Sequence, residues 1–134
     1  MEDLAYFNGK FMPIHEVRIC PLDRGFLFAD GVYEVVPVYN KKPFFFKEHL
    51  DRLYRSLKKI RLDPGVKKEE MKSCIEELII QTKHSHQIVY VQITNSSGNL
   101  NVNYLVTMPC QFYQFFNTTF YLLFLYARVQ SFFF

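Results

Sequence analysis

Formal charge is nearly absent from the last 51 residues of this 134-residue sequence. Every Asp and Glu lies at or before Glu77, every Lys lies at or before Lys83, and Arg128 is the only charged residue that follows. Soluble domains carry charge throughout, at about 25% of their residues. The composition therefore divides the chain near residue 84.

Paired cysteines and metal-ligand spacings are also missing. Cys20, Cys74 and Cys110 lie far apart, with no CxxC pair and no histidine at ligand spacing. This pattern excludes a disulfide framework and a zinc site, and we expect no metal. The sequence also lacks a phosphate-binding glycine loop and a nucleophile elbow.

The charge balance excludes two further classes of protein. The net charge is +3, but basic and acidic residues alternate along the first 83 positions, so no basic patch for nucleic acid is expected. No basic region followed by an apolar run opens the chain, which argues against a secretory signal. We expect a cytoplasmic protein with reduced thiols and no nucleic-acid partner.

Strands are indicated at both ends of the charged region. Residues 4–7 and 11–14 flank Asn8-Gly9, a pair that favours a tight hairpin turn. Residues 32–39 are rich in β-branched and aromatic side chains, and they predict a second hairpin with residues 43–46. Residues 88–94 predict another strand.

Apolar spacing predicts two helices between these strands. In residues 47–60 and 67–83, apolar side chains recur every three or four positions, which places them on one helical face. These side chains are Leu50, Leu53, Tyr54, Leu57 and Ile60 in the first helix and Met71, Cys74, Ile75, Leu78 and Ile79 in the second. The sequence therefore predicts an α+β fold, with helices on one face of a mostly antiparallel sheet.

Residues 95–134 have a different character. Residues 111–134 contain eleven Phe or Tyr in 24 positions, which is typical of a low-complexity segment. We expect one domain over residues 1–94 and a divergent aromatic-rich tail over residues 95–134.

Three motifs resemble class IV pyridoxal-phosphate-dependent aminotransferases. They are YFNGKFMP at 6–13, DRGFLFADGVYEVVPVY at 23–39 and EHLDRLYRSLKKI at 48–60. The resemblance covers residues 5–94 and implies the small N-terminal domain of a two-domain fold. It is strongest to the D-amino acid enzymes. Branched-chain aminotransferases usually carry Phe-Glu-Gly at Tyr33-Glu34-Val35, and aminodeoxychorismate lyases usually carry Phe-Glu-Thr; both families remain alternatives.

The resemblance implies roles for two residues. Arg52 would bind the phosphate of pyridoxal phosphate, and Tyr33 would line the substrate pocket. From the residues alone, Arg52 is interpreted as a solvated helix residue, because it lies off the apolar stripe, and the alternative for Tyr33 is a strand tyrosine packed into the core. The resemblance also implies homodimers that transfer an amino group between a D-amino acid and a 2-oxo acid. Asp23 and His49 are interpreted as structural, Asp23 as a helix N-cap.

The sequence departs from the family after Thr94. The D-amino acid enzymes continue with Arg-Gly and then Arg-x-His, which grips the substrate carboxylate, whereas residues 95–102 read NSSGNLNV. No lysine follows Lys83, so no catalytic Schiff-base lysine is identified. We expect a frameshifted or truncated chain that lacks activity and binds no cofactor by itself. A tail-anchored protein and a noncatalytic binding module are the alternatives, although polar residues at 109–119 make a membrane span unfavourable.

Overall fold

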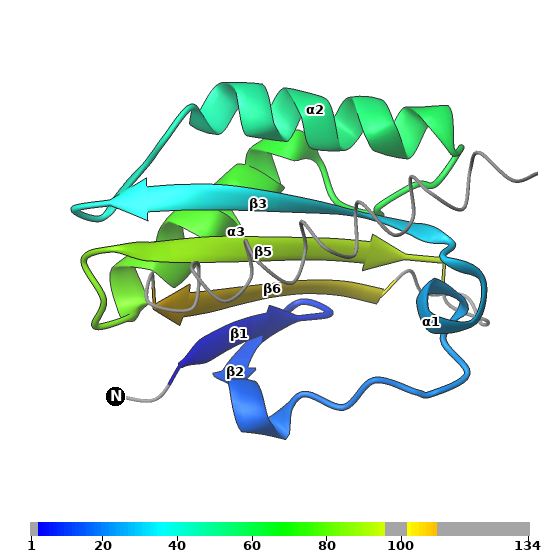
Figure 1. Cartoon of the computed structure of the whole chain (residues 1–134), viewed down its shortest axis with the longest axis horizontal. Coiled ribbons are helices and arrows are strands. Elements are labelled where there is room, and N and C mark those ends of the chain that lie inside the picture. Colours follow the sequence, from blue (N-terminus) through cyan, green and yellow to red (C-terminus); the bar gives the residue numbers. More distant parts are fainter. Residues whose placement is uncertain (1–2, 96–101, 110–134) are drawn as a thin grey trace, which may run out of the picture.

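The computed structural model describes residues 3–95 and 102–109 (Figure 1). Strands, helices and further strands follow one another along the chain, which confirms the expected α+β fold. The elements are β1 (Leu4–Phe7), β2 (Lys10–Pro13), a 3-10 turn (Ile14–Glu16), α1 (Arg24–Phe28), β3 (Gly31–Tyr39), β4 (Lys42–Pro43), α2 (Phe46–Lys59), α3 (Lys68–Gln81), β5 (Gln87–Thr94) and β6 (Val102–Pro109).

Both expected hairpins are present. β1 and β2 pair across Asn8 and Gly9, which adopt φ angles of 47° and 91°. β3 turns into β4 through Asn40 and Lys41, also at positive φ. The second strand of this hairpin is shorter than the expected residues 43–46, because Phe45 is left-handed (φ 43°) and α2 begins immediately after it.

The described strands form one antiparallel sheet in the order β2-β1-β6-β5-β3-β4. β6 lies between β1 and β5 and pairs with β5 over its whole length, from Gln87↔Pro109 to Thr94↔Val102. The sheet therefore continues past residue 94, the boundary expected from the sequence. A central strand has partners at both edges and needs no charged side chains to keep it soluble, so loss of charge does not mark loss of structure.

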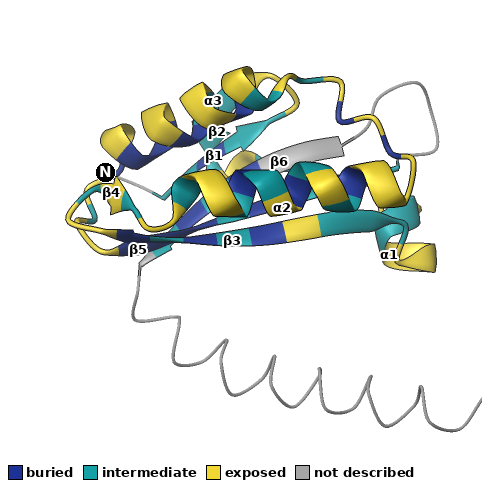
Figure 2. Cartoon of the chain, turned by 90° about the horizontal axis from the view of Figure 1, so that it is seen from above, coloured by how far each residue is buried: buried dark blue, intermediate teal, exposed yellow. Residues whose placement is uncertain are grey.

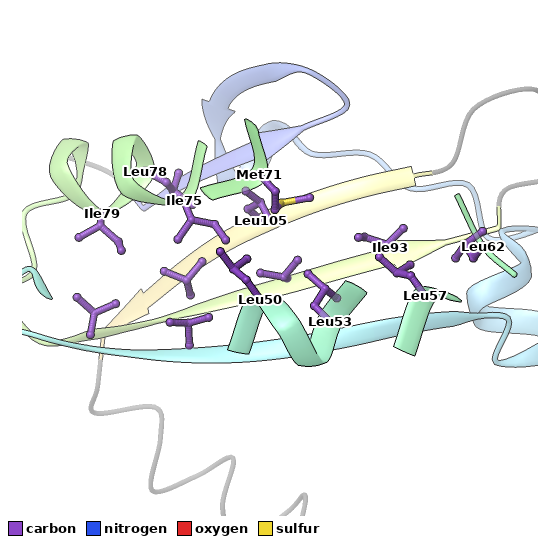
Figure 3. Close-up of a cluster of buried hydrophobic side chains, with 14 residues drawn as sticks. Leu50, Leu53, Leu57, Leu62, Met71, Ile75, Leu78, Ile79, Ile93 and Leu105 are labelled. Carbon is purple, nitrogen blue, oxygen red and sulfur yellow. The ribbon is translucent and has the colours of Figure 1, made fainter. Parts of the chain in front are cut away.

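The hydrophobic core lies between the sheet and the two long helices, which cover the same face (Figure 2). Figure 3 shows side chains of α2, α3 and the strands meeting there. The buried helix residues are Leu50, Leu53, Leu57, Met71, Ile75, Leu78 and Ile79, so most of the expected apolar stripes are confirmed. Ile60 differs, with 45% of its surface exposed, because α2 ends at Lys59.

Candidate functional site

A buried carboxylate on β3 joins the sheet to α2. The side chain of Glu34 is 4% exposed and lies on the helix-covered face. Arg52, on α2, approaches it with two nitrogens: Nε donates to Oε2 at 2.7 Å and Nη2 donates to Oε1 at 2.6 Å. Such a two-point contact fixes the plane of the guanidinium.

Two more groups contact the same carboxylate. The backbone N–H of Val35 donates to Oε1 at 2.9 Å, and His49 Nδ1 lies 2.9 Å from the same oxygen. Burial would raise the pKa of Glu34, but the hydrogen bonds from Arg52, His49 and Val35 outweigh it and hold the pKa below its ordinary value. Glu34 is therefore ionised at neutral pH. It contacts both Arg52 and His49, and these three residues are called the Glu34–Arg52–His49 cluster.

The contact between Glu34 and Arg52 should stabilise the folded state. We expect Arg52→Ala to lower the free energy of unfolding by about 1–2 kcal/mol at pH 7, because Glu34 loses its main partner while Arg52 itself is largely exposed. The pKa of Glu34 is lower in the folded state than its ordinary value of 4.5. The stabilisation by the Glu34–Arg52 pair is therefore fully present above pH 4.5, and it is lost as the pH falls through the folded-state pKa. Urea unfolding of both proteins between pH 3 and 7 measures this. A difference that stays constant over this range would contradict it.

Tyr33 points from β3 to the face opposite Glu34, because successive strand residues alternate. Its side chain is 51% exposed and stacks on Tyr90 of β5, with ring centroids 5.9 Å apart and an interplanar angle of 15°. The pKa of Arg52 is raised, mainly by its hydrogen bond to Glu34 and to a small extent by Tyr33. The structure thus joins Arg52 to Glu34 and leaves the Tyr33 side chain on the opposite face of the sheet, stacked on Tyr90.

The turn before β3 is fixed by a buried aspartate. Asp23 is the N-cap of α1, as expected: it accepts hydrogen bonds from the backbone N–H of Gly25 at 2.7 Å and from Thr94 Oγ1 at 3.0 Å. A side chain at Gly31 would lie 2.7 Å from the carbonyl oxygen of Ile93, so this position requires glycine. These contacts tie the start of β3 to the end of β5.

Glu34 and His49 belong to the site although sequence reasoning gave neither a role toward a ligand. The signal for Glu34 was its place in the Asp-Gly-Val-Tyr-Glu motif. His49 was interpreted as a hydrogen-bonded structural residue, and its contact with Glu34 agrees with that interpretation.

A groove between α2 and α3 is a separate feature. It encloses about 440 Å³ and is lined by Pro43, Phe46, Lys47, Leu50, Lys68, Glu69, Lys72 and Glu76. Its ammonium groups are paired: Lys47 and Lys68 both contact Asp51, and Lys72 lies 3.7 Å from Glu76. With Glu69 counted as well, three ammonium groups are matched by three carboxylates, so the groove carries no net charge.

Residues 3–95 and 102–109 contain neither a cluster of metal ligands nor a helix that could span a membrane. No three His, Cys, Asp or Glu side chains there gather closely enough to hold a metal ion. No helix in this part of the chain has the length and apolar character needed to cross a membrane. The tail-anchor alternative rests on residues 84–127, which carry no formal charge, and residues 96–101 and 110–127 of this run lie outside the described residues.

Comparison with known proteins shows which family the chain resembles. The chain is 46% identical over 92 residues to a D-alanine aminotransferase from Listeria monocytogenes, a match that covers 69% of this chain and 32% of that protein. It is 39% identical over 92 residues to the D-alanine aminotransferase of Bacillus licheniformis, with the same coverage. A putative branched-chain-amino-acid aminotransferase from Methanocaldococcus jannaschii is 33% identical over 98 residues, covering 73% and 34%. The chain thus spans about a third of the length of these relatives.

Solved structures agree in fold. The T.th. branched-chain amino acid aminotransferase with pyridoxamine 5′-phosphate superposes with a TM-score of 0.75 at 21% identity, over 81% of this chain and 40% of that one. The Escherichia coli branched-chain enzyme gives 0.73 at 19% identity, over 81% and 40%. A model of the amino-transferase class IV family matches residues 31–129, beyond residue 94, where the motif resemblance stopped. This chain belongs to the class IV aminotransferase family.

Proposed function

We propose that this chain forms the small domain of a pyridoxal-phosphate-dependent aminotransferase of the D-amino acid type, with Arg52 as the ligand of the cofactor phosphate. The observation that carries the proposal is the arginine itself. It is held by a buried carboxylate, yet 58% of its side chain is exposed. The relatives named D-alanine aminotransferase support the substrate class, and the solved relative with pyridoxamine 5′-phosphate supports the cofactor.

The donor chemistry of Arg52 fits a phosphate. A guanidinium has five N–H groups, and Glu34 takes one from Nε and one from Nη2. Nη2 also lies 3.3 Å from His49 Nδ1, and both N–H groups of Nη1 remain for contacts with phosphate oxygens. When bound, the cofactor would supply the electron sink for amino-group transfer. Arg52 would anchor it without taking part in proton transfer.

Tyr33 is proposed to line the substrate pocket. It lies on the sheet face that α2 and α3 do not cover, and the stack with Tyr90 limits the movement of its ring. Its phenol O–H is a suitable donor for a substrate carboxylate. Arg52, on α2, would then hold the phosphate of the cofactor, while Tyr33, on the uncovered face of β3, would contact the substrate.

These 134 residues are proposed not to catalyse transamination alone. No lysine follows Lys83, no arginine lies between Arg61 and Arg128, and no histidine follows His86. The family takes its Schiff-base lysine from the C-terminal domain, and these residues show no counterpart of its carboxylate-binding Arg-x-His. A cytoplasmic homodimer is the arrangement that the family suggests.

From the sequence alone we expect no cofactor binding by this chain, but the exposed N–H donors of Arg52 support binding of the phosphate group by itself. Binding of pyridoxamine 5′-phosphate tests this role of Arg52, because this compound forms no Schiff base with lysines. We expect Arg52→Ala to weaken its binding by about tenfold or more, since charge-assisted hydrogen bonds are lost. Arg55→Ala, on the exposed side of the same helix, is the matched control and should bind normally. Equilibrium dialysis with pyridoxamine, which lacks the phosphate, shows how much of the affinity depends on that group. Equal binding by the wild type and Arg52→Ala would refute the proposal.

A further inference from the structure

The position of the Arg52 side chain depends on Glu34 more than on α2. Arg52 is largely exposed and lies off the buried stripe of Leu50, Leu53 and Leu57, so helix packing does not select one rotamer for it. The hydrogen bonds from Nε and Nη2 to Glu34 do select one. They also determine which N–H groups remain for a ligand: both on Nη1, since Nη2 also lies 3.3 Å from His49 Nδ1.

Glu34 is itself held rigidly. It lies on β3, next to β5 in the sheet, and its Oε1 accepts from Val35 N–H at 2.9 Å and lies 2.9 Å from His49 Nδ1. His49 and Arg52 are both on α2, three residues apart and therefore on the same side of the helix. The carboxylate thus connects a fixed strand to both helix residues.

We propose that Glu34 is a positioning residue for phosphate binding: its buried carboxylate orients the Arg52 guanidinium so that the remaining N–H groups face the phosphate. This inference rests on the proposed role of Arg52. It adds that the affinity for the phosphate also depends on Glu34, whose own carboxylate contacts Arg52, His49 and the backbone N–H of Val35.

Two effects of Glu34 oppose each other. Its negative charge repels a phosphate, and a pair of unit charges about 4 Å apart in water changes a binding constant by a factor of about five. Fixing a long arginine side chain in advance removes a rotamer cost equivalent to a factor of about 30. Because Arg52 neutralises the carboxylate, the repulsion is reduced further, and orientation is the larger effect.

The experiment is a double-mutant cycle in the full chain with pyridoxamine 5′-phosphate as the probe. The proteins are the wild type, Glu34→Gln, Arg52→Ala and the double variant, with Arg55→Ala as the control. Glu34→Gln keeps the size of the side chain but replaces one acceptor oxygen with an NH2 group that faces the guanidinium. We expect it to weaken binding by about three- to tenfold in the wild type and to have no further effect in the Arg52→Ala background.

A second measurement needs no ligand. In the wild type, the Arg52 Nε–H signal in a ¹⁵N–¹H spectrum should exchange slowly with water, and in Glu34→Gln it should exchange as fast as that of Arg55. Circular dichroism identifies any variant that does not fold. Glu34→Asp then takes its place, because the shorter side chain keeps the charge but loses the two-point contact.

The outcomes separate this inference from the proposed function. If Arg52→Ala weakens binding but Glu34→Gln binds like the wild type or more tightly, Glu34 does not position Arg52, although Arg52 still binds the phosphate. If Arg52→Ala also binds like the wild type, both proposals fail. If Glu34→Gln weakens binding equally in the presence and absence of Arg52, the effect does not pass through Arg52 and the inference is overturned.

Discussion

A chain that ends at Asn95 is expected to lose its fold. β6 is a central strand, and its removal leaves β1 and β5 without their shared neighbour. Leu105 of β6 is completely buried in the core, and Thr107 is buried with its hydroxyl donating to the Leu4 carbonyl at 3.3 Å. Truncating one such leucine to alanine costs about 2–5 kcal/mol. The free-energy cost of removing the whole strand therefore exceeds the free energy of unfolding of a typical domain, which is about 5–15 kcal/mol.

The measurement compares two truncations. A chain that ends at Pro109 keeps β6 and should unfold cooperatively with heat, as followed by circular dichroism. The chain that ends at Asn95 should show no cooperative transition and should sediment as aggregate, because its open strand edges are sites for association. Leu105→Ala in the longer chain should unfold cooperatively at a lower temperature. A cooperative, monomeric chain ending at Asn95 would show that residues 1–94 fold as a domain without β6.

The sequence predicted the elements whose information is local. The apolar spacing of Leu50, Leu53 and Leu57 determines one helical face, and Asn8-Gly9 determines a turn, whatever the rest of the chain does. The end of β4 was harder to predict from the sequence. It depends on the left-handed backbone conformation of Phe45, which phenylalanine rarely adopts.

The partners of β6 could not be predicted in this way. β6 pairs with β1, about a hundred residues earlier, as in Ala5↔Val106, and such pairing leaves no local pattern. The lack of charge after Lys83 was interpreted as a change of character in the chain, whereas in β6 it reflects a strand with neighbours on both edges.

The site was predicted in part. Arg52 and Tyr33 were identified through their motifs, but Glu34 was passed over because its chemistry depends on a contact between a strand and a helix 18 residues apart. Besides its place in the Asp-Gly-Val-Tyr-Glu motif, Glu34 gave a second signal: it is an acidic residue on a strand of otherwise apolar and aromatic residues, and a buried carboxylate requires a partner.

The second large effect is expected in a chimeric enzyme. Residues 3–95 of this chain would replace the matching segment of the Listeria monocytogenes D-alanine aminotransferase, to which the chain is 46% identical over 92 residues. The relative would supply all that follows, including the strand that corresponds to β6 and the remaining two thirds of its length. We expect the chimera to transaminate D-alanine, whereas the 134-residue chain alone should not.

Arg52→Ala in this chimera is the most direct test of the account. Loss of two charge-assisted hydrogen bonds to the phosphate should raise the dissociation constant of pyridoxal phosphate by about 100-fold, with activity recovered in part at high cofactor concentration. Arg55→Ala should leave the constant unchanged. A folded chimera whose affinity for pyridoxal phosphate is unaffected by Arg52→Ala would contradict the assignment of Arg52 as the phosphate ligand.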